Sequence, residues 1–203
     1  MKNVLFVSLG CDKNLVDSEK MLGLLNEAGY RVAQEESEAD AIVVNTCCFI
    51  HDAKEESIET ILEMAEWKKK GDLRALIVTG CMAQRYQDEI MKELPEVDAV
   101  IGTMSIESIV EAVEQSLKKK GYTHFEDLGY LPKSYDKRVI TSGTYMGYLK
   151  IAEGCNKRCT YCIIPSVRGN YRSVPMEDVM KQAEYLVQNG ITELCLVAQE
   201  TTV

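Results

Sequence analysis

The sequence predicts an α/β protein with a parallel sheet, followed by the beginning of a second α/β unit. Short runs rich in β-branched residues alternate with longer amphipathic stretches, which is typical of buried strands that are each followed by a helix. Such alternation favours βα units. It weakens after residue 117 and resumes near residue 145. We therefore expect a domain over residues 1–117, a linker over 118–144 and an incomplete second unit over 145–203.

Four strand-like runs define the first domain, and each is followed by a helical pattern. Their apolar, β-branched composition indicates strands that are covered on both faces. A parallel sheet with this alternation is flavodoxin-like or Rossmann-like in type. The runs are NVLFVS, AIVV, ALIVT and VDAVI.

The helices of this domain have recognisable ends. The first amphipathic stretch should stop at Gly29, and the second, over residues 53–69, should stop at Gly71, because glycine adopts the left-handed conformation that ends many helices. Asp52, with Glu55 three residues later, resembles a capping box at the start of the second helix.

The second unit has the order strand, helix, strand. YMGYLKIA and ELCLVA are the predicted strands, and Pro175 opens a helix that runs to about Gln188 before Gly190. One βαβ unit leaves a sheet edge and an apolar helix face without partners. We therefore expect the chain to be an N-terminal fragment of a longer protein.

Composition narrows the class of protein. No apolar run is long enough to span a membrane, and the N-terminus lacks the pattern of a signal peptide, so we expect a cytoplasmic protein. Its net charge of −9, from 32 acidic and 23 basic residues, argues against a nucleic-acid surface in this stretch. Disulfides are rare in the cytoplasm, so the eight cysteines indicate metal binding or catalysis.

Three cysteines lie close together in GCNKRCTYC. Cys155, Cys159 and Cys162 have the spacing C-x3-C-x2-C, which lets a loop wrap around one iron–sulfur cluster. Three thiolates leave one iron of a four-iron cluster open to a small molecule. A zinc site is the alternative, but its usual paired cysteines are missing and neither His51 nor His124 is near.

Three further cysteines occupy equivalent positions in the first domain. Cys11, Cys47 and Cys81 each lie just beyond the carboxyl end of a predicted strand. Because those ends share one edge of a parallel sheet, the three thiolates should converge on a second cluster. The alternative is that they are ordinary buried cysteines.

These motifs resemble those of a known family. The triplet, with Tyr161 before its last cysteine, resembles the radical S-adenosylmethionine (SAM) signature, and SLGCDKN, NTCCFI and TGCMAQR resemble the N-terminal domain of methylthiotransferases. The resemblance covers nearly the whole chain. It implies two 4Fe-4S clusters, S-adenosyl-L-methionine bound at the triplet cluster, and a second unit that begins a radical SAM (β/α) barrel.

Within the family, the motifs are most similar to the branch that adds a methylthio group to an aspartate of small-subunit ribosomal protein twelve. The tRNA-modifying branch usually has Gln-Met-Asn where this chain has Asp12, Lys13 and Asn14. The implied partners are that ribosomal protein and an electron donor such as flavodoxin or ferredoxin. Two alternatives stay open: a tRNA adenosine (i6A or t6A) methylthiotransferase, and a non-catalytic iron–sulfur cluster-binding fragment. The chain alone is expected to be inactive.

The resemblance also suggests contacts to the cofactor, and no catalytic residue beyond the cluster ligands. Tyr161 would pack near the adenine, and Gln199 and Glu200 would lie near the amino group. Arg168 and Arg172 could bind the cofactor carboxylate or an acidic substrate residue, because guanidinium binds carboxylate in a bidentate manner. An ordinary loop aromatic and solvated loop arginines are the alternatives.

Two cysteines have no assigned role. Cys48 stands where the family usually has glycine, and we prefer Cys47 as the ligand because it directly follows the pair Asn45–Thr46. Cys195 lies within an apolar strand and is expected to be a packed core thiol.

Polar residues near Cys11 could line the N-terminal cluster site. They are Asn14, Asp17 and Glu19, and Asp17 could instead cap the next helix. None is expected to be catalytic.

Overall fold

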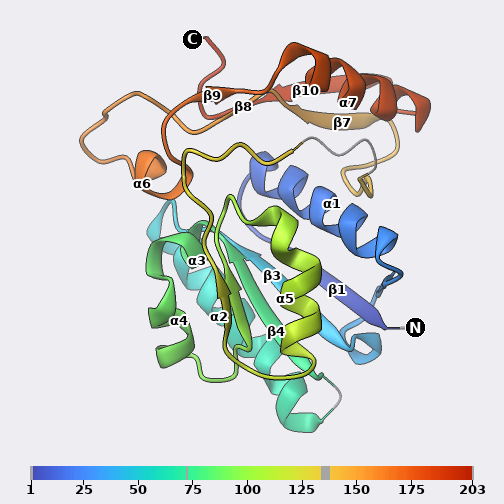
Figure 1. Ribbon diagram of the computed structural model, residues 1–203, viewed down its shortest axis with the longest axis vertical. Helices are drawn as coiled ribbons and strands as arrows, with labels where there is room; N and C mark the ends of the chain where they lie inside the picture. The colour runs from blue at the N-terminus through green and yellow to red at the C-terminus, as the bar shows by residue number, and fades with distance from the viewer. Residues whose placement is uncertain (1, 72, 134–137, 203) are drawn as a thin grey trace.

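The computed structural model describes residues 2–71, 73–133 and 138–202 and shows a sheet domain next to a smaller second unit (Figure 1). The sheet has six strands in the order β2-β1-β3-β4-β5-β6, and every pair is parallel, which confirms the predicted α/β class. The strands are β1 (Asn3–Ser8), β2 (Arg31–Val32), β3 (Ala41–Thr46), β4 (Ala75–Gly80), β5 (Ala99–Ile101) and β6 (Tyr122–His124).

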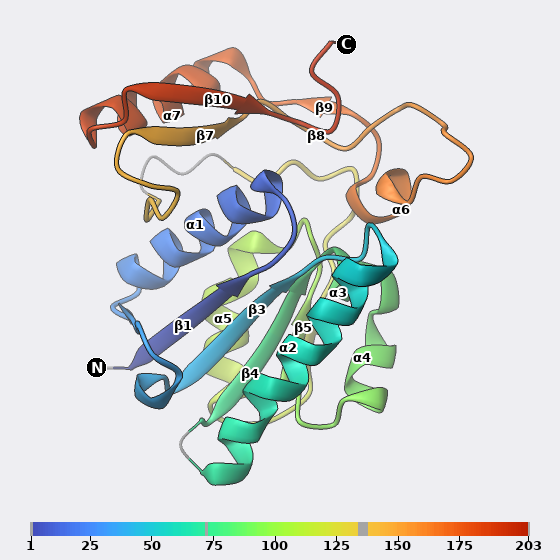
Figure 2. The same cartoon turned by 180° about the vertical axis from the view of Figure 1, so that it is seen from behind.

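Helices cover both faces of this sheet. In Figure 1, α1 and α5 lie in front of the strands, and the reverse view in Figure 2 brings α2, α3 and α4 forward. Within the described residues, no helix has both the length and the apolar character needed to cross a bilayer. The helices are α1 (Asp12–Glu27), α2 (His51–Lys70), α3 (Cys81–Tyr86), α4 (Asp88–Glu93) and α5 (Ile109–Ser116), with short 3-10 turns η1 (Glu36–Glu38) and η2 (Ile106–Ser108).

The central strands are buried on both faces because consecutive side chains point in opposite directions. Val43 and Ile77 belong to the core against α1 and α5, whereas Val44 and Val78 belong to the core against α2 and α3. All six residues of β3 and of β4 are buried. This explains why these strands read as continuous apolar runs in the sequence.

The helix ends agree with the glycine pattern but not with the predicted capping box. Gly29 and Gly71 have φ angles of 86° and 89°. Helix α1 ends at Glu27, two residues before Gly29, and α2 ends at Lys70, directly before Gly71. The prediction of a capping box is wrong, because α2 begins at His51 with Ile50 as its N-cap, and no side chain caps the helix. Asp52 instead lies in the first turn, where a carboxylate is favoured by the helix dipole.

The sixth strand lies in the stretch 118–144, which was expected to be a linker. Residues 122–124 pair in parallel with β5, with Ala99 opposite Tyr122. This short run is only partly buried and lies between polar neighbours, so it carries little strand signal of its own. Residues 134–137 of the same stretch lie outside the described residues.

The second unit has the predicted βαβ order. Its parallel strands β7 and β10 pair with Cys195 opposite Tyr148, and α7 begins directly after Pro175. An antiparallel pair and a short helix flank the cysteine-rich loop. The elements are β7 (Met146–Lys150), β8 (Ala152–Glu153), α6 (Ile164–Arg168), β9 (Arg172–Ser173), α7 (Met176–Gln188) and β10 (Glu193–Val197).

Candidate metal centres

The three N-terminal cysteines lie at one edge of the sheet, where β1, β3 and β4 end. Cys11 is the N-cap of α1, Cys47 directly follows β3, and Cys81 directly follows β4 as the first residue of α3. Because β1, β3 and β4 are neighbours in the sheet, the topology brings the three turns together. The three cysteines thus follow the carboxyl ends of neighbouring strands, as expected, and their sharing of one cluster stays a prediction.

Two glycines allow these turns to approach closely. A Cβ atom added to Gly10, whose φ is 87°, would lie 2.7 Å from Cβ and 3.0 Å from Sγ of Cys47. A Cβ atom on Gly80, whose φ is 91°, would lie 2.4 Å from the carbonyl oxygen of Thr46. Only glycine fits at both positions, and Gly80 directly precedes Cys81.

Asn14 connects the turns that hold the cysteines. Its Nδ2 donates to the carbonyl oxygens of Leu9 and Thr46, each at 3.0 Å. Its own carbonyl oxygen accepts from Asn45 Nδ2 at 2.8 Å. The Sγ of Cys81 lies 3.9 Å from Asn14 Oδ1. Asn14 is completely buried, so its amide orders the backbone around the three thiols.

A candidate single-ion site is distinct from the cysteine trio. Among the described residues, one group of three histidine, cysteine or acidic side chains is close enough to hold one ion, and the cysteine trio is not that group. A four-iron cluster would bind each thiolate of the trio to a separate iron, and this assignment stays a prediction. The group that satisfies the single-ion criterion is exposed and consists of His51, Asp52 and Glu55.

Cys47 and Cys48 have different environments. Cys47 lies against Gly10, and its backbone N–H donates to Ser57 Oγ at 3.0 Å. Cys48 packs in the hydrophobic core, and burial raises the pKa of its thiol to about 11. Cys81, a proposed ligand, lies in the same core and burial raises its pKa as well, so this environment does not separate Cys47 from Cys48. The choice of Cys47 stays a prediction.

The Cys81 thiol has a cation beside it. Burial raises the pKa of Cys81, and the guanidinium of Arg168 opposes that rise by its charge and by a hydrogen bond. The thiols of Cys47 and Cys11 also act on the pKa of Cys81, which agrees with their convergence. The cation belongs to the second unit, whereas the thiol belongs to the sheet domain.

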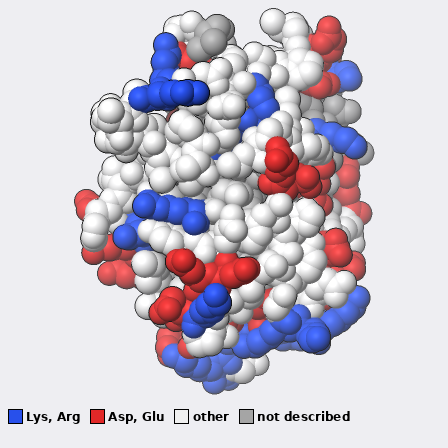
Figure 3. Space-filling view, turned by 60° about the vertical axis from the view of Figure 1, so that its left-hand side comes forward, with Lys and Arg blue, Asp and Glu red and all other residues white. Residues whose placement is uncertain are grey.

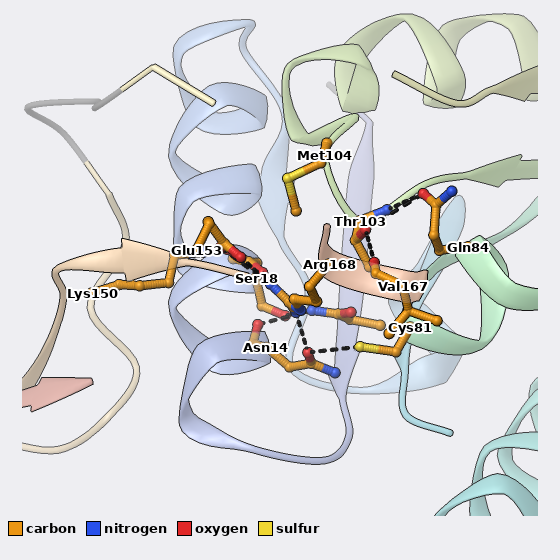
Figure 4. Close-up of polar contacts among 12 residues, drawn as sticks. Asn14, Ser18, Cys81, Gln84, Thr103, Met104, Lys150, Glu153, Val167 and Arg168 are labelled. Atoms are coloured by element: carbon orange, nitrogen blue, oxygen red, sulfur yellow. Dashed lines mark hydrogen bonds and ion pairs between the residues drawn. The ribbon is translucent and has the colours of Figure 1, made fainter. Parts of the chain in front are cut away.

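Arg168 belongs to a buried network that joins the two units (Figure 4). Its Nη1 donates to Asp17 Oδ2 at 2.8 Å and to Glu153 Oε1 at 3.2 Å, and its Nη2 donates to Asn14 Oδ1 at 2.6 Å. Lys150 Nζ is paired with both carboxylates. All five side chains are buried, so their hydrogen bonds and charges compensate one another away from water.

This network was missed in the sequence. Asp17 had been considered as a helix cap, but it lies inside α1, whose N-cap is Cys11. Arg168 was expected at a cofactor or substrate carboxylate, whereas its guanidinium has three protein partners, so the structure lends no support to that role. The available signal was the pair Lys150 and Glu153, two charged residues within the otherwise apolar YLKIAEG.

Glu19 has a related role in joining the units. Its Oε1 accepts from the backbone N–H groups of Thr141 and Ser142 at 2.7 and 3.0 Å, and its Oε2 lies 3.2 Å from Arg138 Nε. Glu19 is fully buried. It therefore anchors the stretch before β7 to α1 and does not line the cysteine site.

The cysteine triplet lies on the loop between β8 and α6. Cys155 is buried, Cys162 is half-buried and Cys159 is exposed. The N–H of Cys155 donates to the carbonyl oxygen of Gly169 at 3.1 Å. A Cβ atom on Gly154, whose φ is 70°, would lie 2.2 Å from the carbonyl oxygen of Asn170. The first cysteine of the triplet is therefore held firmly against the segment that follows Arg168.

The residues expected to contact the cofactor differ in their surroundings. Tyr161 is 88% exposed. Gln199 Oε1 is buried without a hydrogen-bond partner among the described residues, which suits a position that awaits a ligand. Glu200 Oε2 lies 3.6 Å from Lys157 Nζ in the triplet loop. Arg172 donates from Nη2 to the carbonyl oxygen of Arg168 at 3.2 Å. Their contacts with a cofactor stay predictions.

Cys195, predicted to be a core thiol, is half-buried in β10. Its neighbours Leu194 and Leu196 are exposed, at 36% and 57%. These two leucines lie on the sheet face opposite Cys195, because consecutive strand side chains alternate, and that face is largely uncovered. Cys195 itself is only partly buried, so it is not the fully packed core thiol that was predicted.

The surface carries charges of both signs. Figure 3 shows basic and acidic side chains distributed over one face with a broad uncharged area among them. On the face drawn, basic side chains do not form a continuous positive surface.

Two family models match the chain. Residues 3–102 match the family described as uncharacterized protein family UPF0004, and residues 149–203 match the radical SAM superfamily. The first match spans β1 to β5 and includes Cys11, Cys47 and Cys81 along with Cys48, and the second includes the triplet. The two matched regions therefore correspond to the two candidate centres.

Curated relatives match along nearly all of the chain. A protein of Lachnoclostridium phytofermentans described as ribosomal protein uS12 methylthiotransferase RimO is 60% identical over 200 residues, which cover 98% of this chain and 46% of the relative. Proteins with the same description from Pelotomaculum thermopropionicum and Clostridioides difficile are 53% and 48% identical, and the alignments cover 44% and 46% of their lengths. The chain thus spans about half the length of the curated relatives it matches.

Proposed function

Because the chain belongs to the radical SAM methylthiotransferase family that contains these uS12-modifying relatives, we propose that it acts in adding a methylthio group to an aspartate of ribosomal protein uS12. Two 4Fe-4S clusters and S-adenosyl-L-methionine are the cofactors of the proposal. The ligands are Cys11, Cys47 and Cys81 for one cluster and Cys155, Cys159 and Cys162 for the other.

The observation that carries this proposal is that the turns bearing the three strand-end cysteines meet around one buried asparagine, Asn14. Two glycines without room for a Cβ atom bring the turns together, and the trio includes no carboxylate or imidazole donor. Three thiolates around a four-iron cluster leave one iron open for a reactant. The triplet loop offers a second set of three, and Gln199 next to it has a buried, unpartnered oxygen.

The proposed chemistry depends on bound cofactors, because side-chain acids and bases cannot remove hydrogen from an unactivated aliphatic carbon. Clusters and S-adenosylmethionine supply the methyl group, the sulfur site and the radical when they are bound. The chain's own residues bind these cofactors and orient them. The cysteines would hold iron, Asn14 and the glycines fix the cysteine-bearing turns, and the buried ion network joins those turns to the segment around Arg168. A flavodoxin or ferredoxin would supply the electron.

Iron and sulfide counting after anaerobic reconstitution tests the cluster assignment. We expect about eight irons per chain in the wild type and about four in the triple variant Cys155→Ala, Cys159→Ala and Cys162→Ala. The corresponding variant of Cys11, Cys47 and Cys81 should also retain about four, and the six-cysteine variant almost none. A trio variant with the iron content of the wild type would overturn the assignment.

The substrate is tested in a competition. Because the chain alone is expected to be inactive, it is joined to the remaining C-terminal part of the Lachnoclostridium phytofermentans relative. The reconstituted protein is incubated with a reductant, methyl-labelled S-adenosylmethionine, ribosomal protein uS12 and tRNA in one reaction. We expect label on an aspartate of uS12 and release of 5′-deoxyadenosine. Label on tRNA adenosine would replace the proposal with the tRNA-modifying alternative. Loaded clusters without 5′-deoxyadenosine would favour a cluster-binding module.

A further inference from the structure

Arg168 is a buried cation that the second unit contributes to the cysteine site of the first. It ends α6 and is 1% exposed, and it stands far from the sheet domain in sequence. Its Nη2 donates to Asn14 Oδ1 at 2.6 Å, and the Sγ of Cys81 lies 3.9 Å from the same oxygen. A charge in this position is weakly screened, because solvent does not reach it.

The guanidinium has a fixed orientation. Nη1 is bound by Asp17 and Glu153, and Nη2 is bound by Asn14, whose Oδ1 also faces the Cys81 thiol. In Figure 4, Glu153 and Lys150 lie on one side of Arg168, and Asn14 and Cys81 lie on the other. The carboxylates therefore hold the guanidinium so that Nη2 points to Asn14 Oδ1, the oxygen beside Cys81 Sγ.

The position of this charge has a consequence for reduction. A cluster that accepts one electron gains negative charge, and a nearby cation stabilises the reduced form more than the oxidised form. Hydrogen bonds and charges around the thiolates are among the factors that set the potentials of protein-bound clusters. Arg168 is therefore placed to favour reduction of a cluster on Cys11, Cys47 and Cys81.

The same residue is connected to the second cysteine loop. Gly169, the next residue, accepts the N–H of Cys155 at 3.1 Å, and Glu153 precedes Cys155 by two positions. The backbone of this segment thus contacts the triplet, while the Arg168 side chain contacts the trio.

We propose that Arg168 is a positioning residue that raises the reduction potential of the cluster bound by Cys11, Cys47 and Cys81. The inference rests on the proposed function, because it requires that trio to hold a cluster. Arg168 acts through Asn14 and Cys81 and needs no contact with a substrate.

The test measures one cluster in isolation. The chain with Cys155→Ala, Cys159→Ala and Cys162→Ala is reconstituted, and its midpoint potential is obtained by stepwise one-electron reduction with dithionite, followed by electron paramagnetic resonance. Arg168→Gln should shift the midpoint to a more negative value. Arg168→Lys keeps the charge and should lie closer to the wild type. Arg74→Gln is the matched control, because Arg74 is exposed at the opposite end of β4 and should leave the midpoint unchanged.

A second variant guards against loss of folding. Arg168→Gln with Glu153→Gln removes one cation and one anion from the network and keeps its net charge. The negative shift should remain, because the removed cation faced Cys81 and the removed anion did not. If Arg168→Gln or the double variant has full iron content and an unchanged midpoint potential, the inference about Arg168 is overturned and the proposed function is not affected. Loss of iron from both, with retention in Arg168→Lys, would assign Arg168 to cluster assembly and also overturn it. Absence of iron from the parent chain would instead contradict the proposed function.

Discussion

Arg168 donates to the carboxylate of Asp17 at 2.8 Å although 151 positions separate the two residues in the chain. The contact joins α6 of the second unit to α1 of the sheet domain, and both side chains are buried. Replacing such a pair by apolar residues can be neutral, whereas removing one partner leaves an uncompensated buried charge. The network is therefore sensitive to single substitutions.

Glu153→Gln should lower the free energy of unfolding by about 3 kcal/mol at pH 7, because Lys150 and Arg168 lose a buried partner. Burial alone would raise the pKa of Glu153, but the charges of Lys150 and Arg168 outweigh burial and hold the pKa well below its usual value. A depressed carboxyl pKa stabilises the fold above the unfolded pKa of 4.5, and this stabilisation is lost as the pH falls toward the folded pKa. Urea unfolding of wild type and variant should therefore converge below pH 4.5.

The control for this comparison is Glu63→Gln, at an exposed position on α2. It should change the unfolding free energy by less than about 0.5 kcal/mol. An equal loss for Glu63→Gln and Glu153→Gln would contradict the importance of the network.

Lys20→Met should stabilise the protein at neutral pH. Burial and the charge of Lys150 lower the pKa of Lys20 to about 8. The unfolded chain therefore binds the proton more tightly, and the wild-type fold gains stability as the pH rises from about 8 to 10.5. The methionine variant should be more stable by up to about 3 kcal/mol at pH 7, with the gain disappearing near pH 10.5. Lys119→Met, at an exposed position, serves as the control and should show no such trend.

Gly10→Ala should disrupt the N-terminal cluster site. Both Gly10 and Gly29 have φ angles near 87°, and an alanine there costs about 1 kcal/mol in backbone strain. Only at Gly10 would the new Cβ atom also meet Cys47, at 2.7 Å, whereas nothing lies within 4 Å at Gly29. Iron should fall from about eight to about four per chain in Gly10→Ala and stay near eight in Gly29→Ala. Similar iron contents in the two variants would show that the close approach does not matter.

Cys47→Ala and Cys48→Ala should separate the two adjacent thiols. The first variant should lose about four irons, because it removes a ligand of the trio. The second should keep its iron but lose about 1 kcal/mol of stability, because a buried sulfur is removed from the core. Iron counting and urea unfolding measure the two effects. Iron loss confined to Cys48→Ala would make Cys48 the ligand.

The central part of the fold could be read from the sequence because its signals are local. Continuous β-branched runs predicted β1, β3 and β4, and glycines marked the ends of α1 and α2. The capping box failed because it requires Asp52 as the N-cap, whereas the helix begins two residues earlier, at His51, with Ile50 as the N-cap. The strand β6 was missed because its pairing with β5 and not its composition makes it a strand.

The amino-acid sequence by itself determined the parallel α/β sheet and the position of three cysteines at its carboxyl edge, since strand direction and strand ends follow from the order of residues. The tertiary structure alone decided the partners of Arg168, Asp17 and Glu153. Charged residues distant in sequence carry no local sign of their pairing, and their burial becomes favourable only when the second unit packs against α1 and brings opposite charges together.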